Sequence, residues 1–531
     1  MKTYEYLIQH SGYVLFYVWI LRLCTKTKNV QFLALLISLM GFFEAVYGLV
    51  EHLSGSQSIF SYKNFYPESS HLINVATGTF INPNHYGNYL SVCFFITVGL
   101  IGFEFSKNEV QEAGWKERFF QFTSERNSKI LFLMGISSIL MLAIFFSRSR
   151  GAVINLILGS ICFTLLSCQH TRISWKHIAP GACILLSSSM FLLWIGKWPF
   201  TDKWLNLTKN IYLGESFRFK IWEDALTLFS KFPLFGTGAD TFGDVYPLSQ
   251  SIPDVYIQHA HNDYVQALTE YGLLCLVPMI LCIFRIRTYL KVLKIRRRDS
   301  TDYLAFGAFA ACFSFLLHSI FEFNFHIPAN VFVFLSAVAI STLPLRLEPK
   351  SQRDIPWGKG RTIHFPRWTQ LVLISFCMYS VSFCYRISKA GWYLFKVEQG
   401  QGRDDNGKTI ELPLEETHTL LTHAMYYDQK NTQILYRKAL LMQKIPPLKR
   451  SLSTKEYLNE LYDYLILIQR LEPLNYNIHL QLNQLYKKFS LYYEKLGMKE
   501  EVEKFRREAL TELKVAKRLA PTLSRIQNKK F

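Results

Sequence analysis

The sequence predicts an all-α protein: a bundle of about ten transmembrane helices followed by a soluble domain of helical repeats. Half of the 531 residues are hydrophobic and only 19% are charged, whereas about one quarter of the residues are charged in ordinary soluble domains. Apolar runs of membrane-spanning length recur up to about residue 386. The rest of the chain is polar, with apolar residues at the three- and four-residue spacing of helices. These observations exclude an ordinary soluble enzyme.

The basic residues define a topology for the predicted spans. By the positive-inside rule, the basic run 285–298 lies in the cytoplasm, which places the long loop 197–262 and the tail from 387 on the opposite side. A window of about nineteen residues places the candidate spans near 7–23, 30–50, 77–103, 130–147, 151–168, 178–196, 263–284, 303–321, 329–345 and 368–386.

The net charge of +19 does not indicate nucleic-acid binding, because the basic residues flank apolar runs instead of forming one stripe. Anionic membrane lipids are the partners that this pattern favours. The ten cysteines lie in or beside apolar segments, and no CxxC motif occurs. The cysteines therefore indicate no disulfide framework and no zinc site. We separately expect no metal and no cofactor.

The polar tail is predicted to consist of helices near 415–427, 431–443, 454–470, 476–495 and 499–519. The segment Arg470–Pro473 is echoed by Arg518–Pro521, and the pattern resembles degenerate tetratricopeptide hairpins. We thus predict two domains: a membrane bundle over 1–386, including loop 197–262, and an extracytoplasmic helical domain over 387–531. Stacked helix pairs are usually interaction surfaces, so we expect this domain to bind envelope proteins.

Two polar motifs at the outer ends of spans are candidates for function. Residues 78–90 contain Asn82 and Asn84, whose amides would face the external interface at a helix entry. The other motif places Arg148 and Arg150 at the wrong end of a span for the positive-inside rule, which suggests a functional role. Snorkelling of these arginines to lipid phosphates is the alternative.

The long external loop 197–262 contains a predicted amphipathic helix, residues 215–226, that would present Arg218. It also contains Gly236 and Gly238. We interpret this Gly-x-Gly as a tight turn, because the sequence lacks the further glycine and lysine of a phosphate-binding loop.

Histidines cluster at the predicted external ends of the spans. His259 and His261 are two residues apart, a poor spacing for one metal on a helix, so an imidazole that accepts a proton is the better interpretation of His261. Asn262 adjoins it. Late in the bundle, His318 and Glu322 add an imidazole and a carboxylate at the same side.

Taken in order, these motifs resemble the O-antigen ligase superfamily, which includes lipid A-core:O-antigen ligases, surface-polysaccharide polymerases and protein O-oligosaccharyltransferases. The resemblance covers about residues 75–345. The motifs that carry it are Gly78-Thr79-Phe80-x-Asn82-Pro83-Asn84, Ser149-Arg150-Gly151, Arg218-x-x-x-Trp222-x-x-Ala225, Pro233-Leu234-x-Gly236-x-Gly238, and His261-Asn262 followed by nine residues and Gly272.

The resemblance implies a GT-C-like glycosyltransferase in the bacterial inner membrane, with its active site on the extracytoplasmic face. Such enzymes take the glycan from a polyprenyl-diphosphate (undecaprenyl-diphosphate) donor, without a metal, and pass it to a saccharide, lipid or protein acceptor. The family's external arginines map onto Arg148 or Arg150 and onto Arg218, and its histidine maps onto His261. The repeat-like tail favours polymerisation, or transfer to another acceptor, over ligation to lipid A-core.

From the chemistry, we expect His261 to be the general base and the arginines to bind the donor diphosphate. Arg148 and Arg150 would point about 200° apart on a helix, so only one of them should face the diphosphate. Arg150 is favoured because it directly precedes Gly151, as in the family pattern. A transporter or flippase of anionic solutes and a non-catalytic assembly subunit remain as alternatives. The residues expected to support the reaction or to face the acceptor are Asn262, Asn82, Asn84, His318 and Glu322.

Overall fold

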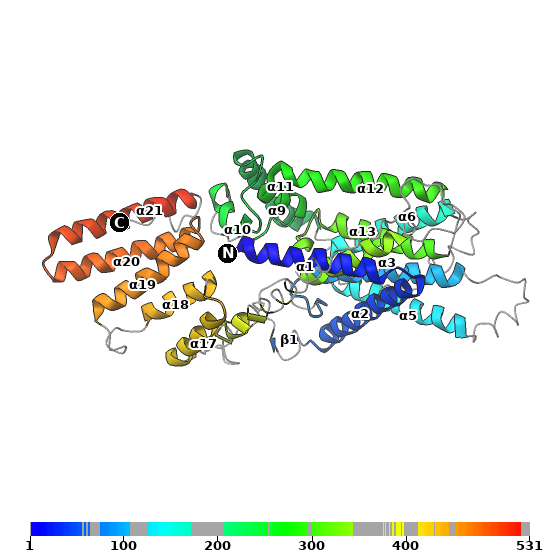
Figure 1. Cartoon of the computed structure of the whole chain (residues 1–531), viewed down its shortest axis with the longest axis horizontal. Coiled ribbons are helices and arrows are strands. Elements are labelled where there is room, and N and C mark those ends of the chain that lie inside the picture. The colour runs from blue at the N-terminus through cyan, green and yellow to red at the C-terminus, as the bar shows by residue number, and fades with distance from the viewer. Residues whose placement is uncertain are drawn as a thin grey trace, which may run out of the picture.

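Helices make up almost all of the structure (Figure 1). Apart from turns and loops, the described residues add only a short antiparallel pair of two-residue strands, β1 (Ser58–Ile59) and β2 (Tyr62–Lys63). The predicted all-α class is confirmed. The computed structural model describes residues 2–55, 58–59, 62–63, 75–106, 125–170, 207–252, 255, 257–295, 300–343, single positions between 375 and 397, 412–429, 431–444 and 453–521.

Six helical segments in the described part of the chain are long and apolar enough to cross a membrane. The chain is therefore a multi-pass membrane protein, as predicted. The six segments are α2 (Thr27–Ser54), α3 (Pro83–Ser106), most of α5 (Glu125–Phe146), most of α6 (Arg150–His170), the joined segment Asp263–Thr288, and α13 (Thr301–His318).

Four of the predicted spans do not correspond to any of these six segments. The first falls within α1 (Lys2–Leu23), and the ninth falls mostly within the shorter apolar helix α14 (Pro328–Ser341); neither helix is among the six. The total of about ten spans stays a prediction. Outside the described residues lie all of 178–196 and most of 368–386.

Helix α3 lies at the centre of the bundle and packs against α2, α5, α6, α13 and α14. Small residues let its backbone approach α13: a Cβ atom on Gly307 would lie 2.5 Å from the carbonyl oxygen of Phe95 and 2.6 Å from Cα of Gly99. Close backbone approach at small residues is the usual way in which membrane helices pack tightly. Because five helices hold α3 in place, its N-terminal end, which carries Asn84, has a fixed position in the bundle.

The start of α3 differs from the prediction of a span over 77–103. Its helix begins at Pro83, because α2 holds the preceding residues in a loop. The Glu51 carboxylate accepts a hydrogen bond from the amide of Gly78 at 2.9 Å, and Glu44 accepts one from the amide of Thr79 at 2.6 Å. Gly78 has a φ of +59°, which glycine adopts without strain. Two carboxylates thus replace the helical partners of these amides.

The predicted span 263–284 is broken after nine residues. Helix α11 (Asp263–Tyr271) ends at Gly272, which has a φ of +60°, and a 3-10 turn, η2 (Gly272–Cys275), leads into α12 (Leu276–Ile295). The turn containing Gly236 and Gly238 packs on this break, where the amide of Leu273 donates to the carbonyl of Pro233 at 2.8 Å. Both glycines in the turn have positive φ values, +69° and +107°. The motif is therefore a tight turn, as predicted.

Replacing Gly236 with alanine is expected to destabilise the protein by about 1–3 kcal/mol. The new Cβ atom would lie 2.3 Å from the backbone of Glu270, and backbone atoms cannot rotate away. Thermal unfolding in detergent measures the effect. Gly135→Ala in α5 is the matched control, because a Cβ atom there meets nothing within 4 Å. Equal melting temperatures for the two variants would contradict the expectation.

Helix α9 (Leu207–Lys231) contains the predicted amphipathic helix of the long loop. Ile221 and Ala225 are buried, as the pattern predicts, but Leu226 is 46% exposed. The buried face includes Asp224 instead, which accepts hydrogen bonds from the hydroxyl of Tyr246 and from the amide of Ser251. The apolar pattern therefore misplaced one position of this face, because a paired carboxylate is buried in it.

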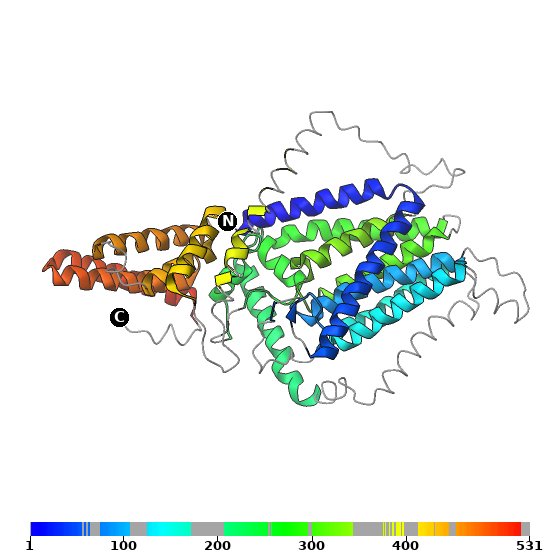
Figure 2. The same ribbon diagram turned by 90° about the horizontal axis from the view of Figure 1, so that it is seen from below.

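The five helices predicted in the tail are confirmed within one residue at each end. Each packs against the next along the chain, and a shared core includes Leu435, Leu461 and Leu482. Figures 1 and 2 show these helices at one end of the long axis, with the apolar helices at the other. The repeat relation and the domain boundary at 386 stay predictions. The helices are α17 (Leu414–Tyr427), α18 (Thr432–Lys444), α19 (Thr454–Leu471), α20 (Tyr476–Lys495) and α21 (Lys499–Leu519).

Candidate active site

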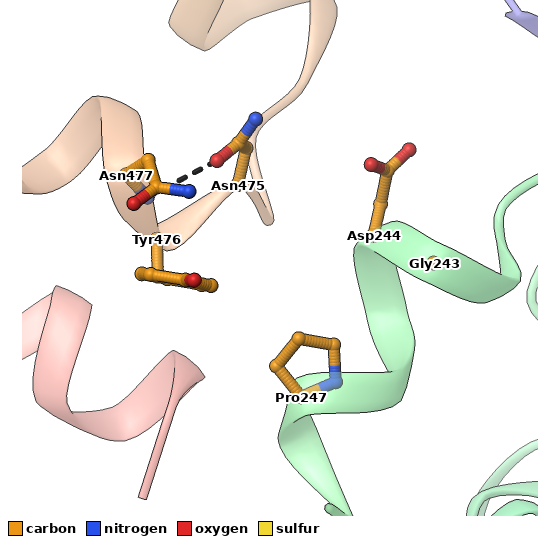
Figure 3. A pocket seen from close by; sticks show the side chains of 6 residues that line it. All are labelled: Gly243, Asp244, Pro247, Asn475, Tyr476 and Asn477. Carbon is orange, nitrogen blue, oxygen red and sulfur yellow. Dashed lines mark hydrogen bonds between the residues drawn. The ribbon is translucent and has the colours of Figure 1, made fainter. Parts of the chain in front are cut away.

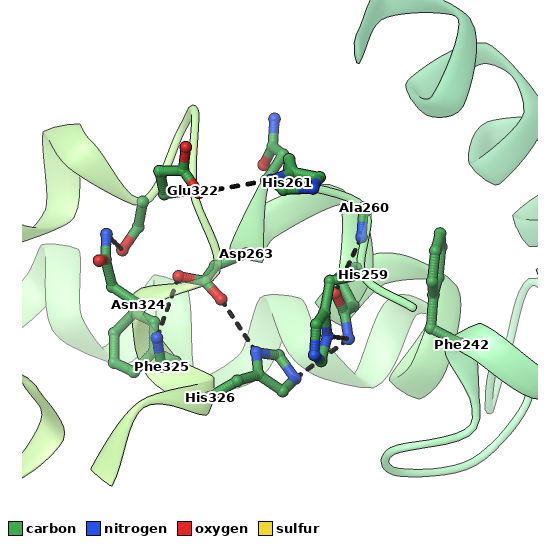
Figure 4. A network of polar contacts seen from close by, with 12 residues as sticks. Phe242, His259, Ala260, His261, Asp263, Glu322, Asn324, Phe325 and His326 are labelled. Atoms are coloured by element: carbon green, nitrogen blue, oxygen red, sulfur yellow. Dashed lines mark hydrogen bonds and ion pairs between the residues drawn. The ribbon is translucent and has the colours of Figure 1, made fainter. Parts of the chain in front are cut away.

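Glu322 is the centre of a polar cluster at the helix ends. It lies in the connection between α13 and α14, and its side chain is 2% exposed. Its Oε1 accepts hydrogen bonds from Nη2 of Arg218 at 2.7 Å and from Nδ2 of Asn84 at 2.6 Å. Its Oε2 lies 3.3 Å from Nδ1 of His261 (Figure 4). Three residues predicted from separate motifs thus meet at the carboxylate of a fourth, Glu322.

The Glu322 carboxyl is held in its ionised form. Burial by itself raises its pKa, but the hydrogen bond with His261 and the positive charge of Arg218 outweigh burial and lower the pKa to about 2. A buried carboxylate at neutral pH accepts hydrogen bonds and donates none. Its neighbours must therefore present N–H groups to it.

His261 is oriented by this carboxylate. Since Glu322 can only accept, Nδ1 of His261 carries a proton, which leaves Nε2 as the nitrogen that can accept one from a substrate. The residue has a φ of +50°, a strained value for a side chain of this size, and its side chain is one-third exposed. The ring of Phe323 contacts it edge-on at 5.1 Å between centroids. His261 is thus a fixed imidazole with an accessible side.

The two other asparagines have structural roles. Oδ1 of Asn262 caps α11 by accepting hydrogen bonds from the amides of Tyr264 and Val265 at 3.0 and 3.1 Å. Oδ1 of Asn82 accepts a hydrogen bond from the amide of Asn84 at 2.9 Å at the start of α3. These two side chains therefore position His261 and Asn84, which adjoin them.

A second polar cluster is built around Gln266 in α11. Nε2 of Gln266 lies 3.0 Å from Nε2 of His326 and 3.3 Å from Nδ1 of His259, while Nδ1 of His326 lies 3.3 Å from Oδ1 of Asp263. Burial and the nearby imidazoles lower the pKa of His259 to about 3. For His326, burial lowers the pKa, but the bond with Asp263 outweighs it and raises the pKa overall. His259 is consequently a neutral ring and no rival base.

The arginine motif forms the turn between α5 and α6. Arg148 has a φ of +53° and lies outside both helices, and Arg150 is the first residue of α6. The expected separation of the two side chains by about 200° assumed one continuous helix, so the argument that only one of them can face the diphosphate is wrong. Which arginine binds phosphate stays a prediction.

His318 lies between this turn and the connection 319–327, called the Glu322 loop, which joins α13 to α14. A Cβ atom on Gly151 would lie 2.7 Å from the ring of His318, so only glycine fits between the turn and the imidazole. On its other side, Nδ1 of His318 accepts a hydrogen bond from Asn324, whose Oδ1 faces His85. His318 is 2% exposed, and it supports the site from inside the bundle.

Sequence reasoning did not single out several supporting residues. Asp263, His326 and Phe323 stand beside predicted residues, but nothing in their local pattern shows that they face His261. Glu44 and Glu51 carried a usable signal: two carboxylates seven apart in an apolar span are rare without a role. Among the described residues, no group of three or more histidine, cysteine or acidic side chains could hold a metal ion.

Comparison with known families agrees with this geometry. Residues 135–280 match the family described as O-Antigen ligase. The chain contains an O-antigen ligase domain. The matched residues include the arginine turn, Arg218, the Gly236 turn and His261. The match supports a membrane-bound glycan ligase or polymerase role. No curated protein matches the sequence.

Proposed function

We propose that this protein transfers an oligosaccharide or polysaccharide from a polyprenyl-diphosphate donor to an acceptor hydroxyl, at the extracytoplasmic face of the bacterial inner membrane. The observation that carries the proposal is the convergence of His261, Arg218 and Asn84 on Glu322, with two of the four residues inside an O-antigen ligase domain. The proposed acceptor is a saccharide, a lipid or a protein.

The chemistry is a single displacement with inversion. Nε2 of His261 takes the proton of the acceptor hydroxyl as its oxygen attacks the anomeric carbon. The bond between that carbon and the diphosphate oxygen breaks, and the diphosphate leaves with the electron pair. Arg148 or Arg150 stabilises the negative charge that develops on it.

Arg218 has a donor geometry that suits the same diphosphate. Nη1 donates to the carbonyl of Phe321 at 2.8 Å and Nη2 to Glu322, so two of the five N–H groups fix its plane. Its side chain is 30% exposed, which leaves an open side toward a substrate. A guanidinium held flat in this way can bind two phosphate oxygens at once.

The position of the cluster favours transfer over transport. The Glu322 loop joins the end of α13 to the start of α14, so the cluster lies at helix ends. A transporter for anionic solutes would place its charged residues near the middle of the membrane. The loop helices α9 and α10 (Phe242–Val245) lie at the same end of the bundle as the tail (Figure 1). This supports the prediction that both are extracytoplasmic.

His261→Ala is expected to abolish transfer while the protein remains inserted and abundant, because the base is lost and the bundle core is untouched. Purified protein in nanodiscs, supplied with polyprenyl-linked glycan from the host, is assayed for product, and the anomeric configuration is read by NMR. His423→Ala, an exposed tail histidine, is the matched control. Wild-type turnover in His261→Ala, or retention of configuration, would overturn the mechanism.

The glycan profile of a deletion strain separates the two kinds of enzyme. Accumulated polyprenyl-linked single repeats would indicate a polymerase, and accumulated finished polymer would indicate a ligase.

A further inference from the structure

A cleft of about 300 Å³ lies between the external loop and the tail. One wall is α10 with the following 3-10 turn, η1 (Tyr246–Leu248), and the other is the start of α20 (Figure 3). Its volume is at the lower end of the range of ligand pockets, about 300–1,000 Å³. The lining residues are Gly243, Asp244, Pro247, Asn475, Tyr476 and Asn477.

The wall on the loop side is rigidly attached to the active site. The amide of Phe242 donates to Glu270 of α11 at 3.2 Å, and the Phe242 ring stacks on Tyr246 at 5.1 Å. The hydroxyl of Tyr246 donates to Asp224 of α9 at 2.9 Å. Helix α9 carries Arg218, and α11 begins two residues after His261. The cleft and the cluster around Glu322 therefore share their supporting helices.

The wall on the tail side is also preformed. Nδ2 of Asn475 donates to Glu472 at 2.8 Å, and its Oδ1 accepts a hydrogen bond from the amide of Asn477 at 3.1 Å. Tyr476 belongs to a small apolar core between α20 and α21, against which Leu248 of the opposite wall packs. Neither wall has to rearrange to admit a ligand.

The lining has the chemistry of a site for sugars. Asp244 accepts hydrogen bonds, and Asn475 and Asn477 can both donate and accept, which suits neighbouring hydroxyl groups. The Tyr476 ring and the pyrrolidine of Pro247 provide apolar surface for the C–H face of a sugar ring. The six described lining residues include a carboxylate and no cation, so they disfavour phosphate, and they are too polar for an acyl chain.

We propose that this cleft binds a stretch of neutral glycan that extends from the reaction site. The proposal rests on the proposed function, because it gives the transferred chain a path over α10 to the tail. The C-terminal helices then act in glycan recognition and complete a binding site that the membrane bundle only half forms. A tail that contributes one wall also makes the affinity depend on the length of the glycan.

Binding is tested with the full-length protein in nanodiscs, in a His261→Ala background where no turnover is expected. The probe is the oligosaccharide of two or more repeats released by mild acid from the polyprenyl-linked pool of the host. Asp244→Asn replaces one charged acceptor oxygen with a donor, and Asn477→Ala removes the side-chain amide, so each should weaken the Kd by about 5–10-fold. Tyr476→Leu, which keeps an apolar side chain in the core, should weaken it as well.

The control is Glu503→Gln, which neutralises an exposed carboxylate on α21 away from the cleft and should leave the Kd unchanged. The proposal would be overturned if all three cleft variants bound the probe with the same Kd as the control. It would also be overturned if the parent protein did not bind the probe. Failure of wild-type protein to transfer glycan, with cleft-dependent binding intact, would instead count against the proposed function alone.

Discussion

Replacing Glu322 with glutamine is expected to lower the rate of glycan transfer by about 10²–10⁴-fold. Glutamine has the same shape, but its amide can turn and donate to Nδ1 of His261. The imidazole then carries its proton on Nε2, the nitrogen that must accept the proton of the attacking hydroxyl. In Ser-His-Asp triads the equivalent change from carboxylate to amide lowers kcat by about 10⁴-fold through the same change of tautomer.

Initial rates with polyprenyl-linked donor, measured in nanodiscs at equal protein amounts, provide the test. Glu223→Gln is the matched control, because that carboxylate is on α9, its side chain is 67% exposed and it pairs only with Lys220 in the described structure. Wild-type turnover in Glu322→Gln would show that this carboxylate does not set the tautomer of His261.

The features that the sequence predicted well depend on local chemistry. Apolar runs of sufficient length identified the six described segments that are long and apolar enough to cross a membrane, and turn residues bounded the five tail helices within one residue. Polar residues at the ends of spans identified His261, Asn84 and Glu322 as candidates, and the amphipathic pattern of the external loop identified Arg218. Each of these inferences needed only a short window of sequence.

Contacts between segments that are far apart in the sequence could not be predicted from short windows. Arg218 and Glu322 are 104 positions apart, and 238 positions separate Asn84 from Glu322, so no spacing rule relates them. Backbone strain also could not be predicted from the sequence, because Arg148 and His261 have positive φ values that non-glycine residues rarely adopt. The helical-wheel argument at the arginine turn was wrong for this reason.

The sequence also assigned too simple a role to Glu322. It was expected to support the acceptor side of the site, whereas the structure places it between the proposed base and a cation. Glu322 therefore couples Arg218 to His261. The charge of Arg218 favours the ionised form of the Glu322 carboxyl, and that ionised form determines the tautomer of His261. The coupling produces a prediction about pH that a separate phosphate-binding arginine would not.

Removing the Arg218 side chain is expected to lower kcat/KM by about 10²–10³-fold and to move the acid limb of the pH–rate profile to higher pH. The charge of Arg218 is one of the two main causes that outweigh burial and keep the pKa of Glu322 at about 2. In Arg218→Ala that cause is lost and burial remains, so the pKa of Glu322 rises. Transfer needs the ionised carboxylate together with an unprotonated Nε2 of His261, and loss of the nearby positive charge favours proton uptake by this coupled pair. Transfer is therefore lost at a higher pH as the solution is acidified.

Arg218→Lys separates the two roles of this residue. Lysine keeps the positive charge beside Glu322, so the acid limb should move less than in the alanine variant. A single ammonium cannot reproduce the planar fork that joins Glu322 to the carbonyl of Phe321, so the plateau rate should still fall. If Arg218 acted only by binding diphosphate, both variants would raise KM and leave the acid limb where it is in the wild type. Profiles of kcat/KM and kcat against pH for the three proteins distinguish these outcomes.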